Sequence, residues 1–418
     1  MSDASALRSA LQNVRLTEVQ TRLVQACVHA GPAGAHAWSE YQRLVPSPVQ
    51  QLRAGDPDLK RLAALLFVSL RRQGITGGAD LFTVLRSAYL REQLRSKEYQ
   101  RICGIVVVEL DRAGVPFVLL RGAALAEPLY GDPALRHAHD IDVLCRDSDA
   151  RVAAEALSAH AEFQAYRRSG DDALIVDHQS SLPVLIHGRA FQLAYYPTDW
   201  PGVWERAGTT EVAGRRAPVL SPVDSLVQCC YRAVHSPRVS PCLWACDAYL
   251  LLSQHRDFDW HAFEQTVARS RLRLPVWCSL KFLADELGAA IPDEVQATLE
   301  AETEGADAME RDLALMGLKR RTGSPGLNPR SGGTSWRQML TRLRWLMLPS
   351  PAYMRWLYGA PNPVVLPLLY VKRLARFIQR GIKGRFGGGP ARPARRVIPA
   401  KAPPSGPAET LGRERILR

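Results

Sequence analysis

Two aspartates stand at alternate positions of the segment DIDVLC, residues 140–145, and their type and spacing suit chemistry better than any other pair in the chain. The segment is otherwise apolar and has the length of a buried strand. Side chains alternate between the two faces of a strand, so Asp140 and Asp142 share one face. Two carboxylates side by side repel each other unless a cation lies between them, and hard oxygen ligands suit Mg²⁺ or Mn²⁺. The spacing therefore predicts a divalent-cation site in which Asp140 and Asp142 are both metal ligands and catalytic residues.

An arginine and a glycine follow the apolar run VPFVLL (residues 115–120) and precede a predicted helix over residues 123–130. A glycine allows close approach of the backbone, a helix N-terminus favours an anion, and a guanidinium can grip phosphate oxygens. We therefore expect Arg121 and Gly122 to bind phosphate. A DxD pair alone is common on protein surfaces, but beside a phosphate binder it indicates metal-assisted phosphoryl or nucleotidyl transfer.

Several polar residues near this segment have both a functional and a structural interpretation. His187 ends a predicted strand, where it would either orient a ligand or carboxylate or make a structural hydrogen bond. His137 and His139 precede DIDVLC in a polar loop, where they would contact nucleotide or be solvated. Asp247 lies on an otherwise apolar helix, so it is either paired in the core or turned toward a cleft.

The elements that must position these residues follow from apolar periodicity. Helical spacing recurs before residue 98 and again after Pro222, and short apolar runs between them predict strands. The predicted fold is α+β: a small mixed sheet flanked by N- and C-terminal helical domains. The predicted helices before residue 115 cover residues 59–72, 81–94 and 98–112, a further helix covers residues 148–161, and the predicted strands cover residues 115–120, 140–145, 173–176 and 183–187. The expected divisions are an N-terminal helical region (1–98), an α/β core (99–220), a helical domain (221–318), a linker (319–335), C-terminal amphipathic helices (336–386) and a disordered basic tail (387–418).

The net charge of the chain is concentrated at its C-terminus. The 418 residues carry a formal charge of +13, and the 47 residues from Lys372 to Arg418 include 13 basic and two acidic residues. The rest of the chain is nearly neutral, which argues against a nucleic-acid-binding body. A Gly/Pro/Ala/Arg tail has too few large apolar groups to fold. It is either a solvated extension or an electrostatic contact with nucleic acid or an anionic membrane.

Eight cysteines lie mostly in apolar runs, with no CxxC pair. We expect reduced, buried thiols in a cytoplasmic protein, and Cys242 and Cys246, one helical turn apart, fit core packing better than metal binding. No signal peptide is visible, and the apolar stretch at residues 363–371 is far shorter than the ~20 residues of a membrane span. We expect no transmembrane segment and, at most, peripheral contact with the inner face of a membrane.

The segment from residue 119 to residue 145 resembles a bacterial nucleotidyltransferase-like family of the DNA polymerase beta-like superfamily, a branch often associated with surface-polysaccharide biosynthesis. The family pattern is a strand ending in LKG, an LY pair, an arginine and DIDLLV. Here it reads LLRG (119–122), LY (129–130), Arg136 and DIDVLC. Weaker likeness extends over about residues 100–375, including IHGRAF (186–191) and LWACDAYLLL (243–252).

The resemblance implies a nucleotidyltransferase-like core and Mg²⁺-dependent transfer of a nucleotidyl group from a nucleoside triphosphate to an unknown acceptor. Asp140 and Asp142 would hold two metal ions, Arg121 and Gly122 would bind the triphosphate, and Arg136 would help to bind the nucleotide or offset charge.

This chain departs from the family pattern at two positions. Arg121 replaces the usual lysine and keeps its charge, whereas Leu185 occupies the position of a third carboxylate. Because leucine cannot bind a hard cation, a catalytically impaired nucleotide-binding scaffold or regulator is the alternative function. Asp177 would substitute for the missing acid if its strand lay next to the pair.

Overall fold

The computed structural model describes residues 16–75, 78–168, 173–191, 200, 202–235, 241–314, 348, 351–358 and 363–375. The chain divides into two compact units, residues 1–363 and residues 364–418. The first unit holds the sheet and most of the described helices. In the second, residues 366–375 form a helix. The predicted linker at 319–335 and the predicted tail at 387–418 lie outside the described residues.

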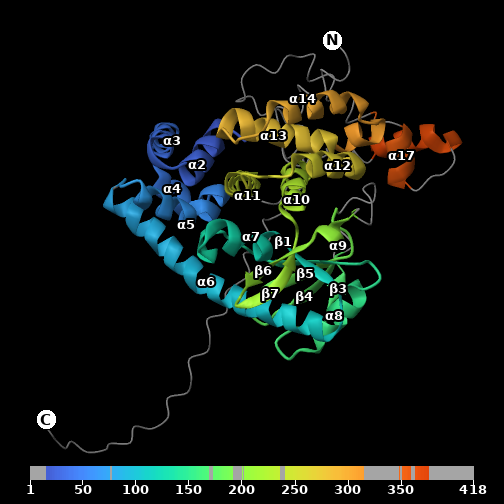
Figure 1. Ribbon diagram of the computed structural model, residues 1–418, viewed down its shortest axis with the longest axis horizontal. Coiled ribbons are helices and arrows are strands. Elements are labelled where there is room, and N and C mark those ends of the chain that lie inside the picture. The colour runs from blue at the N-terminus through green and yellow to red at the C-terminus, as the bar shows by residue number, and fades with distance from the viewer. Residues whose placement is uncertain are drawn as a thin grey trace, which may run out of the picture. The chain divides into compact units, whose positions relative to one another are not determined.

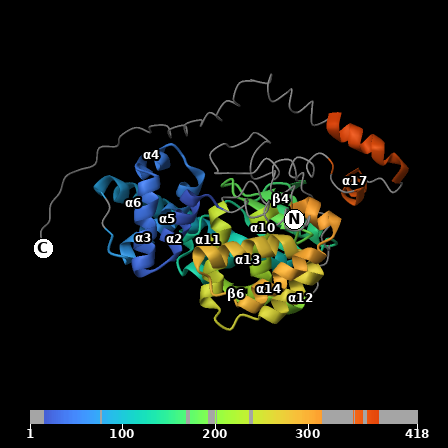
Figure 2. The same cartoon turned by 90° about the horizontal axis from the view of Figure 1, so that it is seen from above.

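The predicted α+β fold is confirmed, because groups of helices precede and follow the strands of a mixed sheet along the chain. The N-terminal helices are α2 (Glu18–Val28), α3 (Gly31–Leu44), α4 (Pro48–Arg53), α5 (Pro57–Arg72) and α6 (Ala79–Arg112). The later helices of the first unit are α10 (Pro222–His235), α11 (Pro241–Gln254), α12 (Trp260–Ser270), α13 (Arg273–Leu287), α14 (Asp293–Glu302) and α17 (Pro351–Tyr358). Figure 2 shows α11 between the N-terminal helices and α13, consistent with its contacts to α2, α5 and α13.

The sheet has seven strands in the order β3-β4-β5-β2-β1-β7-β6. Their bounds are β1 (Phe117–Leu120), β2 (Ile141–Cys145), β3 (Arg167–Arg168), β4 (Leu174–Asp177), β5 (Pro183–His187), β6 (Gly208–Val212) and β7 (Arg215–Val219). The helices α7 (Arg121–Tyr130), α8 (Ala150–Ala159) and α9 (Val203–Arg206) connect them. The central pairs are β1 with β2, antiparallel, and β2 with β5, parallel. All five residues of β2 and all four of β1 are buried, so these two strands form the buried middle of the sheet.

The predicted strands correspond to β1, β2, β4 and β5, and the structure adds β3, β6 and β7. The pair β6 and β7 forms a hairpin whose turn residues Ala213 and Gly214 both have positive φ, at 56° and 71°. The edge strand β6 is mostly exposed and reads GTTEV, and β7 begins with two arginines and contains Pro218, so neither strand has the pattern of a buried apolar run. Apolar periodicity therefore could not reveal it.

Residues 79–112 form one 34-residue helix, α6, where two helices with a boundary near residue 98 were predicted. No proline interrupts this stretch, and the hydroxyl of Ser96, just before the predicted boundary, donates to the backbone carbonyl of Gln93 instead of capping a new helix, so the helix continues. Figure 1 shows α6 running from the N-terminal helices to the region of α8. The helix thus ties the N-terminal region to the sheet.

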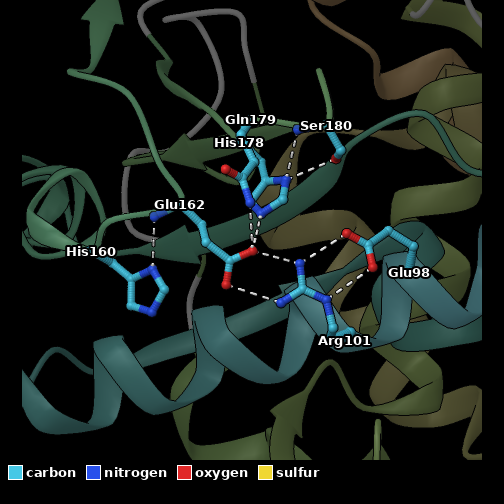
Figure 3. A network of polar contacts seen from close by, with 7 residues as sticks. All are labelled: Glu98, Arg101, His160, Glu162, His178, Gln179 and Ser180. Carbon is cyan, nitrogen blue, oxygen red and sulfur yellow. Dashed lines mark hydrogen bonds and ion pairs between the residues drawn. The ribbon is translucent and has the colours of Figure 1, made fainter. Parts of the chain in front are cut away.

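A polar network fastens α6 to the β4–β5 side of the sheet (Figure 3). At its centre, Glu162 accepts hydrogen bonds from Arg101 of α6 at 3.0 and 2.6 Å and from His178 Nε2 at 3.0 Å. Arg101 also pairs with Glu98 on its own helix, and the Nδ1 atom of His178 accepts a hydrogen bond from the backbone N–H of Ser180 at 3.0 Å. These contacts fix the part of α6 that carries Tyr99, which reaches the site described below.

Candidate functional site

The register of the central strands gathers the predicted site residues at one end of β1. Leu120 pairs with Asp142 across the antiparallel β1–β2 ladder, so Arg121, the next residue, emerges beside Asp142. Asp140 lies immediately before β2, and Asp142 is its second residue. Asp142 in turn lies opposite Leu185 of β5.

Arg121 contacts the carboxylate directly. Its Nη1 atom donates to Asp142 Oδ1 at 2.7 Å, and its side chain is 12% exposed. Its backbone φ is 56°, a region that residues with a Cβ atom seldom adopt and that is concentrated at functional sites. Its Nε atom is buried and has no hydrogen-bond partner among the described residues. The guanidinium is therefore held in place with donor capacity left over.

His187 contacts the same carboxylate oxygen. Its Nε2 atom lies 2.7 Å from Asp142 Oδ1, and both side chains are buried. An ionised carboxylate only accepts hydrogen bonds, so Nε2 carries the proton. Burial alone would raise the pKa of Asp142, but Arg121 and the hydrogen bond from His187 outweigh it and hold this pKa well below its usual range. Asp142 is therefore ionised at neutral pH.

Asp140 differs from its neighbour in charge environment. Burial and the negative charge of Asp142 raise the pKa of Asp140, and Arg121 offsets only part of this effect. No hydrogen bond or ion pair joins its carboxylate to another described residue. The structure thus places the two carboxylates together but gives only Asp142 a fixed set of partners.

A glycine is required at position 122 because the surrounding atoms leave no space for a side chain. A Cβ atom at this position would lie 2.9 Å from Arg136 Nη1, 3.1 Å from Ala138 Cβ and 3.2 Å from the hydroxyl of Tyr99. The same Tyr99 hydroxyl donates to the backbone carbonyl of Asp140 at 3.0 Å. Sequence reasoning missed Tyr99, which lies 41 residues from Asp140 on α6 and acts on the backbone that carries it. A cavity behind Gly122, lined by Cys103, Ala126 and residues nearby, includes neither aspartate.

Arg136 is paired within the protein. Its guanidinium makes two hydrogen bonds to Asp247 of α11, at 2.8 and 2.7 Å, and Tyr130 donates to the same carboxylate at 2.7 Å. Both charged side chains are at least 95% buried. Of the two interpretations of Asp247, the structure supports a residue paired in the core. Arg136 joins the loop before β2 to α11, and its predicted contact with nucleotide stays a prediction.

Two positions bear on the third carboxylate: Leu185, which stands where the family pattern has an acid, and Asp177, which was considered as its replacement. Leu185 is opposite Asp142 in register on a parallel neighbouring strand, so both side chains project from the same face of the sheet. Asp177 is on β4, which neighbours β5 and not β2, and it pairs with Arg167 at 3.0 Å. The condition under which Asp177 would replace the missing acid is therefore not met.

The two loop histidines form a separate cluster against α6. His137 Nε2 lies 2.9 Å from His139 Nε2, His137 Nδ1 lies 2.9 Å from Glu92, and Arg95 donates to the backbone carbonyl of Ala138 at 2.7 Å. Burial and the neighbouring His137 lower the pKa of His139 to about 4. The cluster fixes the loop before Asp140, and His137 is buried where a solvated loop histidine was one expectation.

Arg232 of α10 is a second residue that sequence reasoning missed. Its Nε atom is buried without a hydrogen-bond partner among the described residues. Burial and then the positive charge of Arg121 lower the pKa of Arg232 to about 10, whereas Asp142 acts in the opposite direction. Arg232 lies in the segment QCCYRAV of a predicted helix. The feature of the sequence that could have identified it is a single charge among mostly apolar residues.

The donor set limits which metal arrangement the residues fit. Among the described residues, no three histidine, cysteine, aspartate or glutamate side chains are grouped to hold a metal ion. Asp140 and Asp142 supply two carboxylates, which suit a Mg²⁺ ion that keeps waters and whose coordination is completed by substrate phosphates.

Cys242 and Cys246 are buried free thiols, as are the other six cysteines. No described helix is long and apolar enough to cross a membrane.

A comparison with known proteins identifies the family of this sequence. Residues 58–288 match the family model described as an uncharacterised nucleotidyltransferase. The match begins before the predicted likeness at about residue 100 and ends well before residue 375. The chain matched no curated protein and no solved structure. Because the family match covers more than half of the chain and includes Arg121, both aspartates and His187, this chain belongs to that family of uncharacterised nucleotidyltransferases.

Proposed function

We propose that this protein transfers a nucleotidyl group from a nucleoside triphosphate to an acceptor hydroxyl, with Mg²⁺. The observation that carries the proposal is the contact of Arg121 with Asp142 beside Asp140, at the end of two buried strands. A phosphate-binding cation and a carboxylate pair are the two groups that metal-assisted phosphoryl chemistry needs. The family match supports the same reaction class.

Arg121 and Arg232 are assigned to the phosphates. The two guanidiniums repel each other, and each has a buried Nε donor without a partner among the described residues. An incoming triphosphate would relieve the repulsion and accept hydrogen bonds from these donors. Asp142 competes with the phosphates for Arg121, since Nη1 already donates to its Oδ1 atom. His187 keeps Asp142 in position when Arg121 turns to the phosphates.

Asp140 and Asp142 would hold one Mg²⁺ ion carried in by the nucleotide, which neutralises phosphate charge when bound. Two ions held by the protein, as the family resemblance implied, would require a third carboxylate. Asp142, whose pKa is depressed, remains an anionic ligand. Asp140, whose carboxylate has no hydrogen bond or ion pair with another described residue, would accept the proton of the acceptor hydroxyl through the oxygen that does not bind the cation, and the hydroxyl oxygen would attack the α-phosphorus as pyrophosphate leaves.

Two further parts of the proposal follow from the sequence. The resemblance to proteins of polysaccharide clusters makes a carbohydrate hydroxyl the acceptor to assay first. The eight buried free thiols support a reducing compartment, the cytoplasm, as the place of reaction.

A second function is favoured by Leu185. Its position opposite Asp142 removes the third metal ligand of the superfamily. A chain that binds nucleotide through Arg121 and Arg232 without turnover would act as a nucleotide-dependent scaffold or regulator. Both functions require nucleotide binding, and only the first requires pyrophosphate release.

The test measures both quantities with the full chain, Mg²⁺ and each nucleoside triphosphate. Asp140→Asn and Asp142→Asn are compared with wild type, and Asp177→Asn is the control because Asp177 pairs with Arg167 away from the site. Transfer predicts pyrophosphate release that falls at least ~100-fold in both site variants and stays unchanged in the control. Nucleotide binding without release in wild type would select the scaffold, and absence of binding would exclude both functions.

A further inference from the structure

Gln228 is a buried glutamine of α10, one helical turn before Arg232. Its side chain is 4% exposed, and its Nε2 atom is buried without a hydrogen-bond partner among the described residues. An amide nitrogen buried in this way has lost its hydrogen bonds to water and gained none within the protein, which lowers the stability of the fold. Such a group is rare in folded proteins and is accounted for when a ligand supplies the missing acceptor.

The strand register places α10 at the end of the sheet where Arg121 lies. Leu119 of β1 pairs in parallel with Val219 of β7, so the chain leaves both strands at the same end of the sheet. Arg121 directly follows β1, and α10 begins at Pro222, shortly after β7. Figure 1 shows α10 leading away from this end of the sheet. The first turns of α10 therefore lie near Arg121.

Gln228 and Arg232 project from the same face of α10. They are four residues apart, a spacing at which side chains lie one above the other on a helix, inclined toward its N-terminus. Arg121 lowers the pKa of Arg232 and Asp142 raises it, so Arg232 is close to both. Because α10 begins at the sheet, Gln228 lies about 6 Å nearer to the sheet than Arg232 along the helix axis. It is thus placed between Arg232 and the strand end that carries Arg121.

Three buried N–H donors at this end of the sheet lack an acceptor in the part of the chain that the structure describes. They are the Nε atoms of Arg121 and Arg232 and the Nε2 atom of Gln228. A phosphate chain presents several oxygen acceptors close together, which suits donors that come from two different elements. The carboxamide is neutral, so it adds a donor without adding to the repulsion between the two guanidiniums.

We propose that Gln228 is a phosphate-binding residue, which donates from Nε2 to an oxygen of the triphosphate that Arg121 and Arg232 bind. This inference rests on the proposed function, because it concerns the same nucleotide. The position of Gln228 between the two arginines favours the phosphates over the base or the sugar. The unpartnered amide is then a binding group that is complete only when nucleotide is present.

The experiment measures two ligands by isothermal titration calorimetry with the full-length chain and Mg²⁺. The ligands are each nucleoside triphosphate and inorganic triphosphate, which has the phosphates without base or sugar. Gln228→Leu removes the amide at similar volume, and Gln228→Glu replaces its donor with a negative charge. The matched control is Gln25→Leu, because Gln25 of α2 is also buried but donates from Nε2 to the backbone carbonyl of Glu286 at 2.5 Å. Thermal unfolding without ligand compares the stability of all variants.

Gln228→Leu should weaken the binding of both ligands at least ~10-fold, the loss expected for one hydrogen bond to a charged group. Gln228→Glu should weaken binding further because its carboxylate repels the phosphates. Gln25→Leu should bind both ligands as wild type does. Without ligand, the melting temperature should fall in Gln25→Leu and stay equal or rise in Gln228→Leu, because only Gln25 loses a hydrogen bond made within the protein.

Three results would overturn the inference while leaving nucleotide binding intact. One is unchanged affinity in both Gln228 variants, and another is a melting temperature of Gln228→Leu as low as that of Gln25→Leu, which would mean that Nε2 has a partner within the protein. The third is a loss confined to nucleoside triphosphates, or a wild type that binds these but not inorganic triphosphate, which would assign Gln228 to the base or sugar. A wild type that binds neither ligand would instead overturn the proposed function itself.

Discussion

Leu185→Asp is the substitution that most directly tests the account of the metal site. Leu185 lies opposite Asp142 on a parallel neighbouring strand, so a new carboxylate would start from a Cβ atom about 5 Å from that of Asp142. At an effective dielectric constant of about 20, two unit charges about 5 Å apart repel by about 3 kcal/mol. Arg121 is bonded to Asp142 and would also attract the new carboxylate, so about 3 kcal/mol is an upper bound for the net cost.

The assay is thermal unfolding with EDTA and with Mg²⁺, and Leu185→Asn is the control because it has the same shape without the charge. In EDTA, the aspartate variant should be less stable than the asparagine variant by up to about 3 kcal/mol. Mg²⁺ at about 100 times its dissociation constant should return about 2.7 kcal/mol to the aspartate variant and little to the asparagine variant. Pyrophosphate release should rise in the aspartate variant if wild type is limited by the missing ligand.

Equal stability of the two variants in EDTA, together with equal indifference to Mg²⁺, would refute the reasoning. It would mean that position 185 does not face the carboxylate pair in solution. A metal response without any gain in pyrophosphate release would keep the cation site and favour the scaffold function.

Two further predictions concern buried charges outside the carboxylate pair. Asp247→Asn should reduce the free energy of unfolding by about 3–5 kcal/mol because it leaves Arg136 charged and buried. Asp177→Asn breaks an exposed pair and should reduce it by less than about 1 kcal/mol. Denaturant titration of both variants measures the difference. Burial raises the pKa of Glu310 to about 7, so the unfolded chain releases this proton at lower pH than the folded chain, and stability falls as pH rises from about 4.5 to 7. Glu310→Gln should remove this fall, about 3 kcal/mol at most, in unfolding curves measured at pH 5 and pH 8; an unchanged fall would assign it to another group.

The sequence predicts the middle of the sheet well because that part obeys local rules. The strands β1, β2 and β5 are short apolar runs between turn residues, and the alternation of DIDVLC fits a strand. The edge hairpin of β6 and β7 follows a different rule: positive φ at Ala213 and Gly214 sets its turn, and its strands are only partly buried. Nothing in its composition distinguishes it from a loop.

The site residues also form two groups, those that sequence patterns identify and those that they miss. Asp140, Asp142, Arg121 and Gly122 are close in the sequence or follow paired strands, so motif spacing finds them. Tyr99 of α6 and Arg232 of α10 reach the site from helices that are distant in the sequence, and sequence reasoning missed both. Asp247 was singled out by its charge on an apolar helix, but it pairs with Arg136 in the core. Which face of each helix meets the sheet depends on packing between segments far apart in the sequence, and a single sequence does not contain that information.

The charges around the carboxylate pair explain why Leu185, and not Arg121, decides between the two functions. Arg121 keeps the positive charge of the usual lysine, and in the proposed reaction it binds the phosphates together with Arg232. Asp142 stays anionic because Arg121 and His187 lower its pKa, while Asp140 bears the cost of the second negative charge. One Mg²⁺ ion with its nucleotide relieves that cost, whereas a second ion would find only leucine opposite Asp142. In the proposed reaction, turnover would therefore depend on whether one ion and the unpaired carboxylate of Asp140 suffice to activate the acceptor. Asp140→Asn tests this by removing a carboxylate from the site, and Leu185→Asp tests it by adding one.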